Sequence, residues 1–522
     1  MAPRSLLLAA SGLILSSAAP AAWYQASSEH FLIFSEQNPA QLRQFAEKLE
    51  KFDGAVRVLR GMEDMPLSKG NRVTIFVVDE QSFQKLSGDK TGFTRGFYRG
   101  SAAGSIAVVD RPPEAGKSRG PGRTAIGSRL ESASDPDYEL GADTVLLHEY
   151  SHHLMMQALS APLPEWLIEG FAEFMAAARF ERDGSVGLGL PAKHRAFGLA
   201  ELRPLPLEVL LSGKYDKITV GERESIYGRG WLLTHYLTFE PTRSGQLARY
   251  IGGIARGLDP LDAARQAFGD LNQLDRDLGG YLRRSALEYR KVSGSALQFA
   301  PLSVSPISDG FAAVLPYVVQ LKNDVADADK PVIAQQVRRI QSLLPGDPDV
   351  ETALAEAELL AGRAAEANAA ADRALNARPK STDALILKGK AVMALAKKTV
   401  PRQAALFVAA RKQFTMANLI DPEDPEPLME FYLSYPEAGM APTANAVAAL
   451  HYASDLAPHD LGLRINSALQ YLRDGKLKEA RLALAPIAYS PHGREVAAMA
   501  RSMIAKIDLG DKEAAEKAAF QQ

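Results

Sequence analysis

The C-terminal part of the chain, residues 311–522, is divided by prolines at nearly regular intervals. Successive members of the series are 34, 43, 36 and 33 residues apart: Pro345, Pro379, Pro422, Pro458 and Pro491. A glycine follows three of these prolines after 17 residues, at Gly362, Gly439 and Gly475. Proline cannot continue a helix, and glycine favours the turn that ends one. The spacing therefore predicts a pair of helices in each interval.

Small and large apolar residues alternate between these breaks, as in the stretches 354–379 and 463–487. This pattern resembles tetratricopeptide repeats, which are helix pairs with a period of about 34 residues. The interval after Pro379 departs from that period, with about nine extra residues near 396–403. The resemblance implies an all-α solenoid over residues 311–522 that binds a protein or peptide partner on its concave surface. An irregular helical bundle is the alternative.

The first 21 residues have the pattern of a signal peptide. Arg4 supplies a positive charge, Leu6–Leu15 is an apolar core, and the small residues end in the cleavage pattern Ala19-Pro20-Ala21. We therefore expect export to a bacterial periplasm or secretion beyond it; a buried N-terminal helix is the alternative. No later run approaches the 18 apolar residues of a membrane span, so we expect none in the mature chain.

Composition excludes two kinds of site. The formal net charge of −2 gives no electrostatic reason to expect nucleic acid as a partner. Cysteine is absent, so the chain has no disulfides and any metal ligands must come from His, Asp and Glu. At 522 residues the chain is too long for one hydrophobic core, and we expect more than one domain.

Residues 22–292 have the mixed pattern of an α+β domain. The expected elements are strands at 30–36, 72–79 and 104–110, and helices at 39–59, 164–180 and 225–239. A long loop rich in Gly, Pro and charge occupies 111–141. The Pro- and Ser-rich stretch 293–310 predicts a linker to the repeats.

The segment Val145–Met156, VLLHEYSHHLMM, carries three histidines and a glutamate in an apolar run. Residues four apart lie about 40° apart around a helix, so His148 and His152 can converge on one zinc ion at about 2.0–2.1 Å. His153 lies about 140° from His148 and cannot share that ion. Glu149 lies about 100° from His148, where it can take a proton from a metal-bound water.

A catalytic zinc site needs a third protein ligand. The next helix, PEWLIEGFAEF, offers Glu165, Glu169 and Glu173, spaced by four and flanked by large apolar residues. A carboxylate buried among such residues needs a cation or strong hydrogen bonds. A solvent-exposed acidic stripe is the alternative.

The motif HExxH followed by W-L-x-E-G-x-A-E resembles the gluzincin metallopeptidases, and most of all the peptidase-MA-like bacterial proteins. The resemblance implies a zincin-like fold with a small sheet, an active-site helix and a helical subdomain, and Zn²⁺ as cofactor. It also implies that Glu169 is the third ligand, that Glu173 orients a ligating histidine and that Glu165 is peripheral. Only 16 residues separate His152 from Glu169, fewer than in thermolysin or aminopeptidase N, so Glu173 stays open as the ligand.

The same resemblance points to a tyrosine on a later helix. It implies that Tyr227 donates a hydrogen bond to the oxyanion of the reaction; a core tyrosine is the alternative, and His235 and Tyr236 are rivals for the role. Zincin clefts hold an extended peptide against an edge strand, for which 104–110 is the candidate.

The sequence therefore predicts an exported zinc-dependent peptidase, acting on a peptide or protein, joined to a repeat domain. One alternative is a zincin-like scaffold protein that has lost turnover. Another is a zinc enzyme that hydrolyses a non-peptide amide.

Overall fold

The computed structural model describes residues 23–64, 67–87, 96–110, 141–158, 162–215, 218–323, 325–398, 403–488 and 494–519. The expected signal peptide, residues 1–21, lies outside these ranges, as does the expected loop apart from Gly141. No helix that the structure describes is long and apolar enough to cross a membrane.

The N-terminal part is built on a six-stranded sheet with the order β4-β5-β3-β2-β1-β9. Its strands are β1 (Tyr24–Ser27), β2 (Phe31–Ser35), β3 (Val73–Val78), β4 (Gly96–Arg99), β5 (Ile106–Asp110) and β9 (Ser303–Pro306). The central strands β2, β3 and β5 are parallel, whereas β1, β4 and β9 each pair antiparallel with a neighbour.

Two expectations are corrected by this sheet. The stretch 104–110 does form a strand, but β5 lies between β3 and β4, so the edge strand on that side is β4. The stretch 293–310 is more than a linker, because β9 within it pairs with β1 as the opposite edge of the sheet. Both errors have one cause: a four-residue strand carries too few side chains to show an alternating pattern.

The sheet is covered on both faces. Ile33, Ile75 and Ala107 point toward α1 (Pro39–Arg60) and α3 (Ala142–Ala158) in the largest hydrophobic core. Phe34, Phe76 and Val108, which alternate with them along the strands, point to the other side. There they pack against α2 (Glu80–Ser87) and α11 (Asp309–Leu321). The helix that carries HExxH therefore lies on one face of the sheet and the repeats begin on the other.

A helical subdomain follows α3. It contains α4 (Glu165–Ala176), α5 (Ala196–Ala200), α6 (Leu207–Ser212), α7 (Val220–Phe239), α8 (Gln246–Ala255), α9 (Pro260–Phe268) and α10 (Leu271–Leu282). A small sheet of β6 (Arg179–Phe180), β7 (Val186–Leu188) and β8 (Arg290–Val292) completes it. The helices α4 and α7 cross so closely that a Cβ atom on Gly170 would lie 2.3 Å from the backbone of Gly230.

The C-terminal part is an array of helix pairs, as the proline and glycine spacing predicts. After α11 the helices are α12 (Lys330–Leu343), α13 (Pro348–Leu360), α14 (Ala364–Ala377), α15 (Thr382–Lys398), α16 (Ala404–Ile420), α17 (Pro425–Glu437), α18 (Ala444–Leu456), α19 (Leu461–Arg473), α20 (Leu477–Leu484), α21 (Arg494–Asp508) and α22 (Lys512–Ala518). Gly362, Gly439 and Gly475 have φ of 75°, 73° and 74° at turns within pairs. This left-handed conformation favours glycine.

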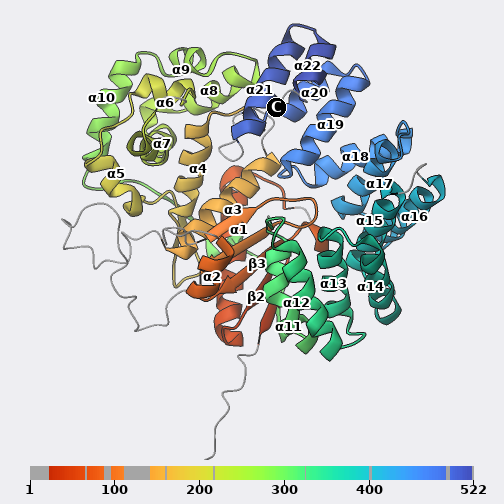
Figure 1. The fold of residues 1–522 in the computed structure, drawn as a ribbon. Helices are drawn as coiled ribbons and strands as arrows, with labels where there is room; N and C mark the ends of the chain where they lie inside the picture. Colours follow the sequence, from red (N-terminus) through yellow and green to blue (C-terminus); the bar gives the residue numbers. More distant parts are fainter. Residues whose placement is uncertain are drawn as a thin grey trace, which may run out of the picture.

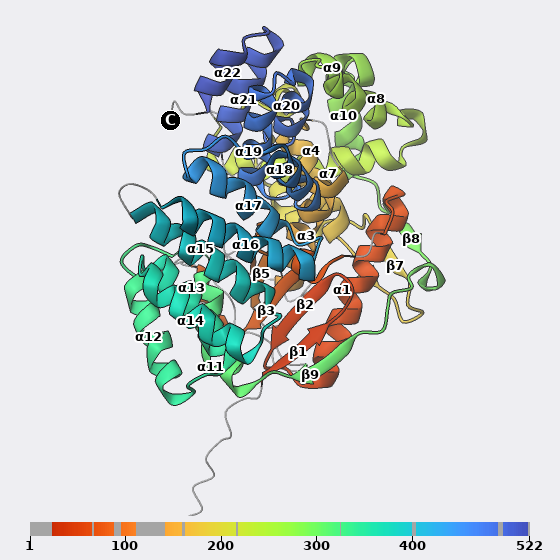
Figure 2. The ribbon, with the colours of Figure 1, turned by 90° about the vertical axis from the view of Figure 1, so that its right-hand side faces the viewer.

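The array curves around the sheet domain, as the two ribbon views show (Figures 1 and 2). Hydrogen bonds join the two parts at separate places along the array. Asn323 Nδ2 donates to the Leu86 carbonyl at 3.0 Å, and Asn71 Nδ2 to the Glu423 carbonyl at 2.9 Å. The Ala102 amide donates to Asp460 Oδ2 at 2.8 Å. The inner side of the array thus contacts the chain's own sheet, whereas the sequence led us to expect it to be open to a partner.

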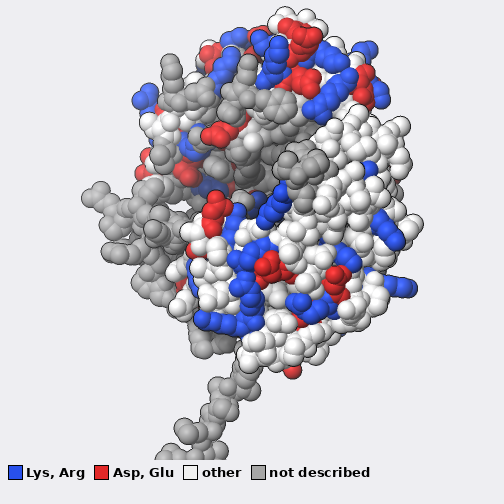
Figure 3. Space-filling model, turned by 45° about the vertical axis from the view of Figure 1, so that its right-hand side comes forward, with Lys and Arg blue, Asp and Glu red and all other residues white. Residues whose placement is uncertain are grey.

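Charged side chains of both signs are interspersed on the molecular face in Figure 3, which also has a broad region without them. No large field of one sign is visible on that face, in keeping with the small net charge.

Candidate metal centre

The two motif histidines lie on the side of α3 that faces α4. The opposite side of α3 carries Leu147, Tyr150 and Leu154, which are buried in the core beneath the sheet. The helix is thus anchored by its apolar residues, and His148 and His152 are directed at the acidic residues of α4. This division explains why one apolar run can also carry imidazoles.

Three side-chain atoms converge at this place. His148 Nε2 lies 3.1 Å from Glu169 Oε2 and 3.1 Å from His152 Nε2. His152 Nε2 and Glu169 Oε2 are 3.4 Å apart, so the three atoms form a triangle. Ligands of a tetrahedral zinc ion at about 2.0–2.1 Å lie about 3.3–3.4 Å from one another. The triangle has the size that such an ion requires.

The Glu169 carboxylate is 1% exposed, and its Oε1 has no hydrogen-bond partner among the described residues. Burial alone would raise the pKa of Glu169, but the adjacent His152 and His148 hold it well below its ordinary value. A buried carboxylate that stays ionised, with an oxygen left over, is a suitable cation ligand. The residues present therefore fit a zinc ion.

Glu173 lies behind the triangle. Its Oε1 lies 3.2 Å from His148 Nδ1, which leaves Nε2 of that ring directed at the other two atoms of the triangle. This is the usual arrangement by which a carboxylate fixes the tautomer and orientation of a metal-binding histidine. Of the two glutamates, Glu169 is the one with an oxygen close to the Nε2 atoms of both imidazoles.

Two residues that the sequence reasoning missed hold Glu173 in turn. His194 Nε2 donates to Glu173 Oε2 at 2.6 Å, and Arg195 Nη2 donates to Glu173 Oε1 at 2.6 Å. Burial alone would raise the pKa of Glu173, but Arg195, His148 and His194 hold it well below its ordinary value. The available signal was the basic run at 193–195, because a second buried glutamate on α4 needs cations of its own.

Glu165 is not part of the centre. It lies at the start of α4, and its Oε1 accepts a hydrogen bond at 3.1 Å from Nη1 of Arg223, which is on the first turn of α7.

Glu149 follows His148 on α3 and is partly exposed. Burial raises the pKa of Tyr98 on β4 above its ordinary value, and the charge of Glu149 adds to this rise.

Tyr227 of α7 faces the same centre. Its ring centroid is 6.3 Å from that of His148, and the guanidinium carbon of Arg195 lies 4.7 Å from the Tyr227 ring. Burial and the charge of Glu169 raise the pKa of Tyr227 above its ordinary value, so the hydroxyl keeps its proton and can donate.

The rivals of Tyr227 lie elsewhere. His235 is fully buried, with Nδ1 2.9 Å from the Tyr281 hydroxyl and Nε2 3.0 Å from the Gly189 carbonyl oxygen. The hydroxyl of Tyr236 accepts a hydrogen bond from Arg243 Nε at 3.5 Å. Both residues have structural partners in the helical subdomain.

His153 points away from the centre, as the helical spacing predicts. Its Nδ1 lies 2.6 Å from the hydroxyl of Tyr98 on β4, and its ring centroid is 4.7 Å from that of His459, between α18 and α19. This histidine therefore joins α3, β4 and the repeat array.

A second group, His30, Asp53 and Asp64, also brings possible ligand atoms within 4.8 Å of one another. Burial alone would lower the pKa of His30, but Glu50 and Asp53 raise it to about 9, so the ring is a cation at neutral pH. Arg57 Nε donates to Asp53 Oδ2 at 2.6 Å. His30 and Arg57 thus already pair with the carboxylates of this group, which is an ion network.

Comparison with known proteins shows a likeness to a repeat protein. No family model matches the chain, and no curated protein matches it. A solved tetratricopeptide-repeat protein of Thermus thermophilus is 21% identical, with 38% of this chain and 99% of that chain covered and a TM-score of 0.32. The helix pairs α11 to α22 themselves, rather than this likeness, define the array.

Proposed function

We propose that the chain is an exported zinc-dependent peptidase with His148, His152 and Glu169 as the metal ligands. The observation that carries the proposal is the triangle of ligand atoms 3.1–3.4 Å apart around a buried, ionised carboxylate. When bound, a zinc ion in such a site lowers the pKa of its water toward about 7 and polarises a carbonyl group.

The remaining groups supply the acid–base chemistry. Glu149, next to a ligand and partly exposed, accepts a proton from the attacking water and delivers it to the leaving amine. Tyr227 keeps its proton and donates a hydrogen bond to the oxyanion of the tetrahedral intermediate. Glu173 keeps His148 in the tautomer that binds metal.

Within the described residues β4 is an outer strand of the sheet, and it replaces 104–110 as the candidate strand for substrate. It is the outer strand on the side of α3, and a Cβ atom on Gly96 of β4 would lie 3.2 Å from Val145 of that helix. An extended peptide that pairs with β4 would add a strand to the sheet beside the metal ligands. The outer helices of the array offer a surface for a protein partner, as stacked helix pairs do.

The test measures zinc per chain and then peptide cleavage by the wild type and Glu149→Gln. We expect one zinc in each protein and a loss of cleavage in the variant of at least about a hundredfold, the scale of general-base catalysis. Zinc without cleavage of any peptide by either protein would favour the scaffold alternative. Cleavage of a non-peptide amide alone would favour the third interpretation.

A further inference from the structure

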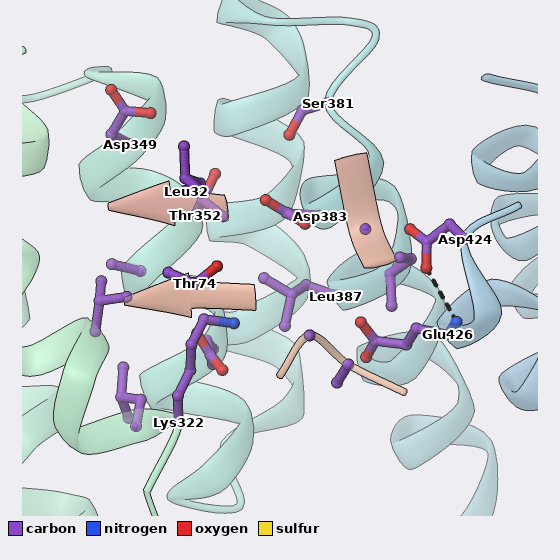
Figure 4. A pocket seen from close by; sticks show the side chains of 18 of the residues that line it. Leu32, Thr74, Lys322, Asp349, Thr352, Ser381, Asp383, Leu387, Asp424 and Glu426 are labelled. Carbon is purple, nitrogen blue, oxygen red and sulfur yellow. Dashed lines mark hydrogen bonds between the residues drawn. The ribbon is translucent and has the colours of Figure 1, made fainter. Parts of the chain in front are cut away.

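A cavity of about 370 Å³ lies between the sheet and the repeat array (Figure 4). Its sheet side is lined by Leu32, Phe34, Thr74 and Phe76, which point away from α3, and its other side by the inner helices α11, α13, α15 and α17. The sheet therefore separates this cavity from the metal centre. Its volume falls within the range of about 300–1,000 Å³ that is usual for small-molecule sites.

Two ion pairs border the cavity. Arg378 Nη1 lies 2.7 Å from Asp349 Oδ1, and Lys390 Nζ lies 3.0 Å from Glu426 Oε1. Asp424 accepts a hydrogen bond from the Glu426 amide at 3.0 Å and so caps α17 (Figure 4). These charges are satisfied within the protein.

Four further charged residues line the same space. Arg72, just before β3, donates from Nη1 to the Ser27 hydroxyl and the Ser28 carbonyl. The other three are Lys322 at the end of α11, Glu356 of α13 and Asp383 in the first turn of α15. Within the described part of the chain, the side chains of Lys322, Glu356 and Asp383 make no hydrogen bond or ion pair. Figure 4 shows Lys322 and Asp383 entering the cavity from different helices. One cation and two carboxylates thus line the same cavity without forming a direct ion pair.

The pKa shifts of Lys322 and Asp383 reflect the same arrangement of opposite charges. Burial alone would lower the pKa of Lys322, but the charges of Glu356 and Asp383 raise it. Asp383 lines the cavity but stays exposed to solvent, and the charge of Lys322 opposes the rise in its pKa. The charges of Lys322, Glu356 and Asp383 therefore act on one another, although their side chains form no direct ion pair.

We propose that this cavity binds a small zwitterion of the amino-acid or dipeptide class. Its ammonium group pairs with Asp383 and Glu356, its carboxylate pairs with Lys322, and its side chain lies against Leu32, Phe34 and Leu387. A ligand with both charges completes the pairing that the protein leaves open, whereas an ion of one sign satisfies only half of it. The site is independent of the proposed function, because no lining residue belongs to the metal centre.

The test is titration calorimetry of the full-length chain with L-leucine and with glycyl-leucine. We expect at least one of them to bind with a Kd of about 1 mM or tighter. N-acetyl-leucine lacks the ammonium group and leucine amide lacks the carboxylate, so both should bind at least about tenfold more weakly. Lys322→Met and Asp383→Asn should weaken binding to the same extent, whereas Lys478→Met, an exposed change on α20, should leave it unchanged.

Circular dichroism of each variant shows whether the fold is retained. The proposal is overturned if neither zwitterion binds, if the blocked analogues bind equally well, or if both cavity variants bind like the wild type. Binding that survives in those variants but disappears when zinc is removed would place the ligand at the metal centre instead. None of these outcomes depends on peptide cleavage.

Discussion

At the scale of single residues, the metal centre depends on a chain of carboxylates and cations that continues beyond the ligands. Glu169 contacts the two imidazoles, Glu173 contacts His148, and Arg195 donates a hydrogen bond to Glu173. Each step places a carboxylate beside a side-chain nitrogen in a buried setting, where such contacts are strong and losing one partner is costly.

Replacing Glu173 by glutamine should weaken zinc binding without removing a ligand. The amide accepts a weaker hydrogen bond from His148, so we expect zinc affinity to fall about 10- to 100-fold. Competition with a chelator measures the zinc affinity of each protein. Glu165→Gln, on the same helix but paired with Arg223, is the matched control and should bind zinc like the wild type. Equal zinc affinity of both variants would contradict the positioning role of Glu173.

At the scale of helices and strands, α3 is held in place by contacts to α1 and β2. The Tyr150 hydroxyl donates to Asp53 Oδ1 of α1 at 2.8 Å, and His30, just before β2, lies 2.8 Å from Glu50 of α1. Tyr150 is the residue after Glu149, so this network sets the rotation of the helix that carries the motif.

The His30 network predicts a pH dependence of stability. The pKa of His30 is about 9 in the folded chain against 6.5 for an ordinary histidine, so protonation stabilises the fold below pH 6.5 and this contribution is lost as the pH rises through 9. Thermal unfolding should therefore show a larger fall in Tm between pH 7 and 9.5 for the wild type than for His30→Gln. Parallel curves for the two proteins would refute this assignment.

The crossing of α4 and α7 gives a second prediction at this scale. A Cβ atom on Gly230 would lie 2.6 Å from the Trp166 carbonyl oxygen, so Gly230→Ala must push the helices apart. We expect a loss of about 1–3 kcal/mol in unfolding free energy and weaker zinc binding, because Glu169 lies on α4. Gly221→Ala, near the start of α7 with open space around it, is the control. Similar denaturation midpoints for the two variants would argue against a close crossing.

The sequence predicted some of these elements and missed others for physical reasons. Helical spacing was enough to predict that His148 and His152 lie close together and that the chain turns at Gly362, because each feature depends on residues near in sequence. The roles of His194 and Arg195 depend on where the chain folds back after α4, which local spacing does not determine. The strands β4 and β9 are too short for a pattern, and their places come from pairing with distant strands.

At the scale of the whole molecule, the repeat array and the sheet domain form one packed unit. Tyr432, Tyr435 and Leu463 of the array share a hydrophobic cluster with Ala102, which lies between β4 and β5. A Cβ atom on Gly100 would lie 3.0 Å from the His459 carbonyl oxygen. The array thus supports the end of the edge strand to which we assign substrate binding.

Asp460 tests this support. It caps α19 through the Leu463 amide and also accepts a hydrogen bond from the Ala102 amide. Asp460→Ala should therefore raise amide hydrogen exchange at residues 100–104 as well as at α19. Asp511 caps α22 in a similar way, because its Oδ1 accepts a hydrogen bond from the Ala514 amide at 2.9 Å. Asp511→Ala should therefore change amide exchange only at α22. Unchanged exchange at 100–104 in Asp460→Ala would contradict the coupling.

In the proposed site, two imidazoles of α3 and one carboxylate of α4 hold a zinc ion. Zinc K-edge X-ray absorption of the purified chain measures this coordination. We expect one zinc with two imidazole nitrogens at about 2.0–2.1 Å and oxygen ligands, and a spectrum that loses one imidazole in His152→Ala. A chain that takes up no zinc, or one whose zinc keeps both imidazoles in His152→Ala, would contradict it.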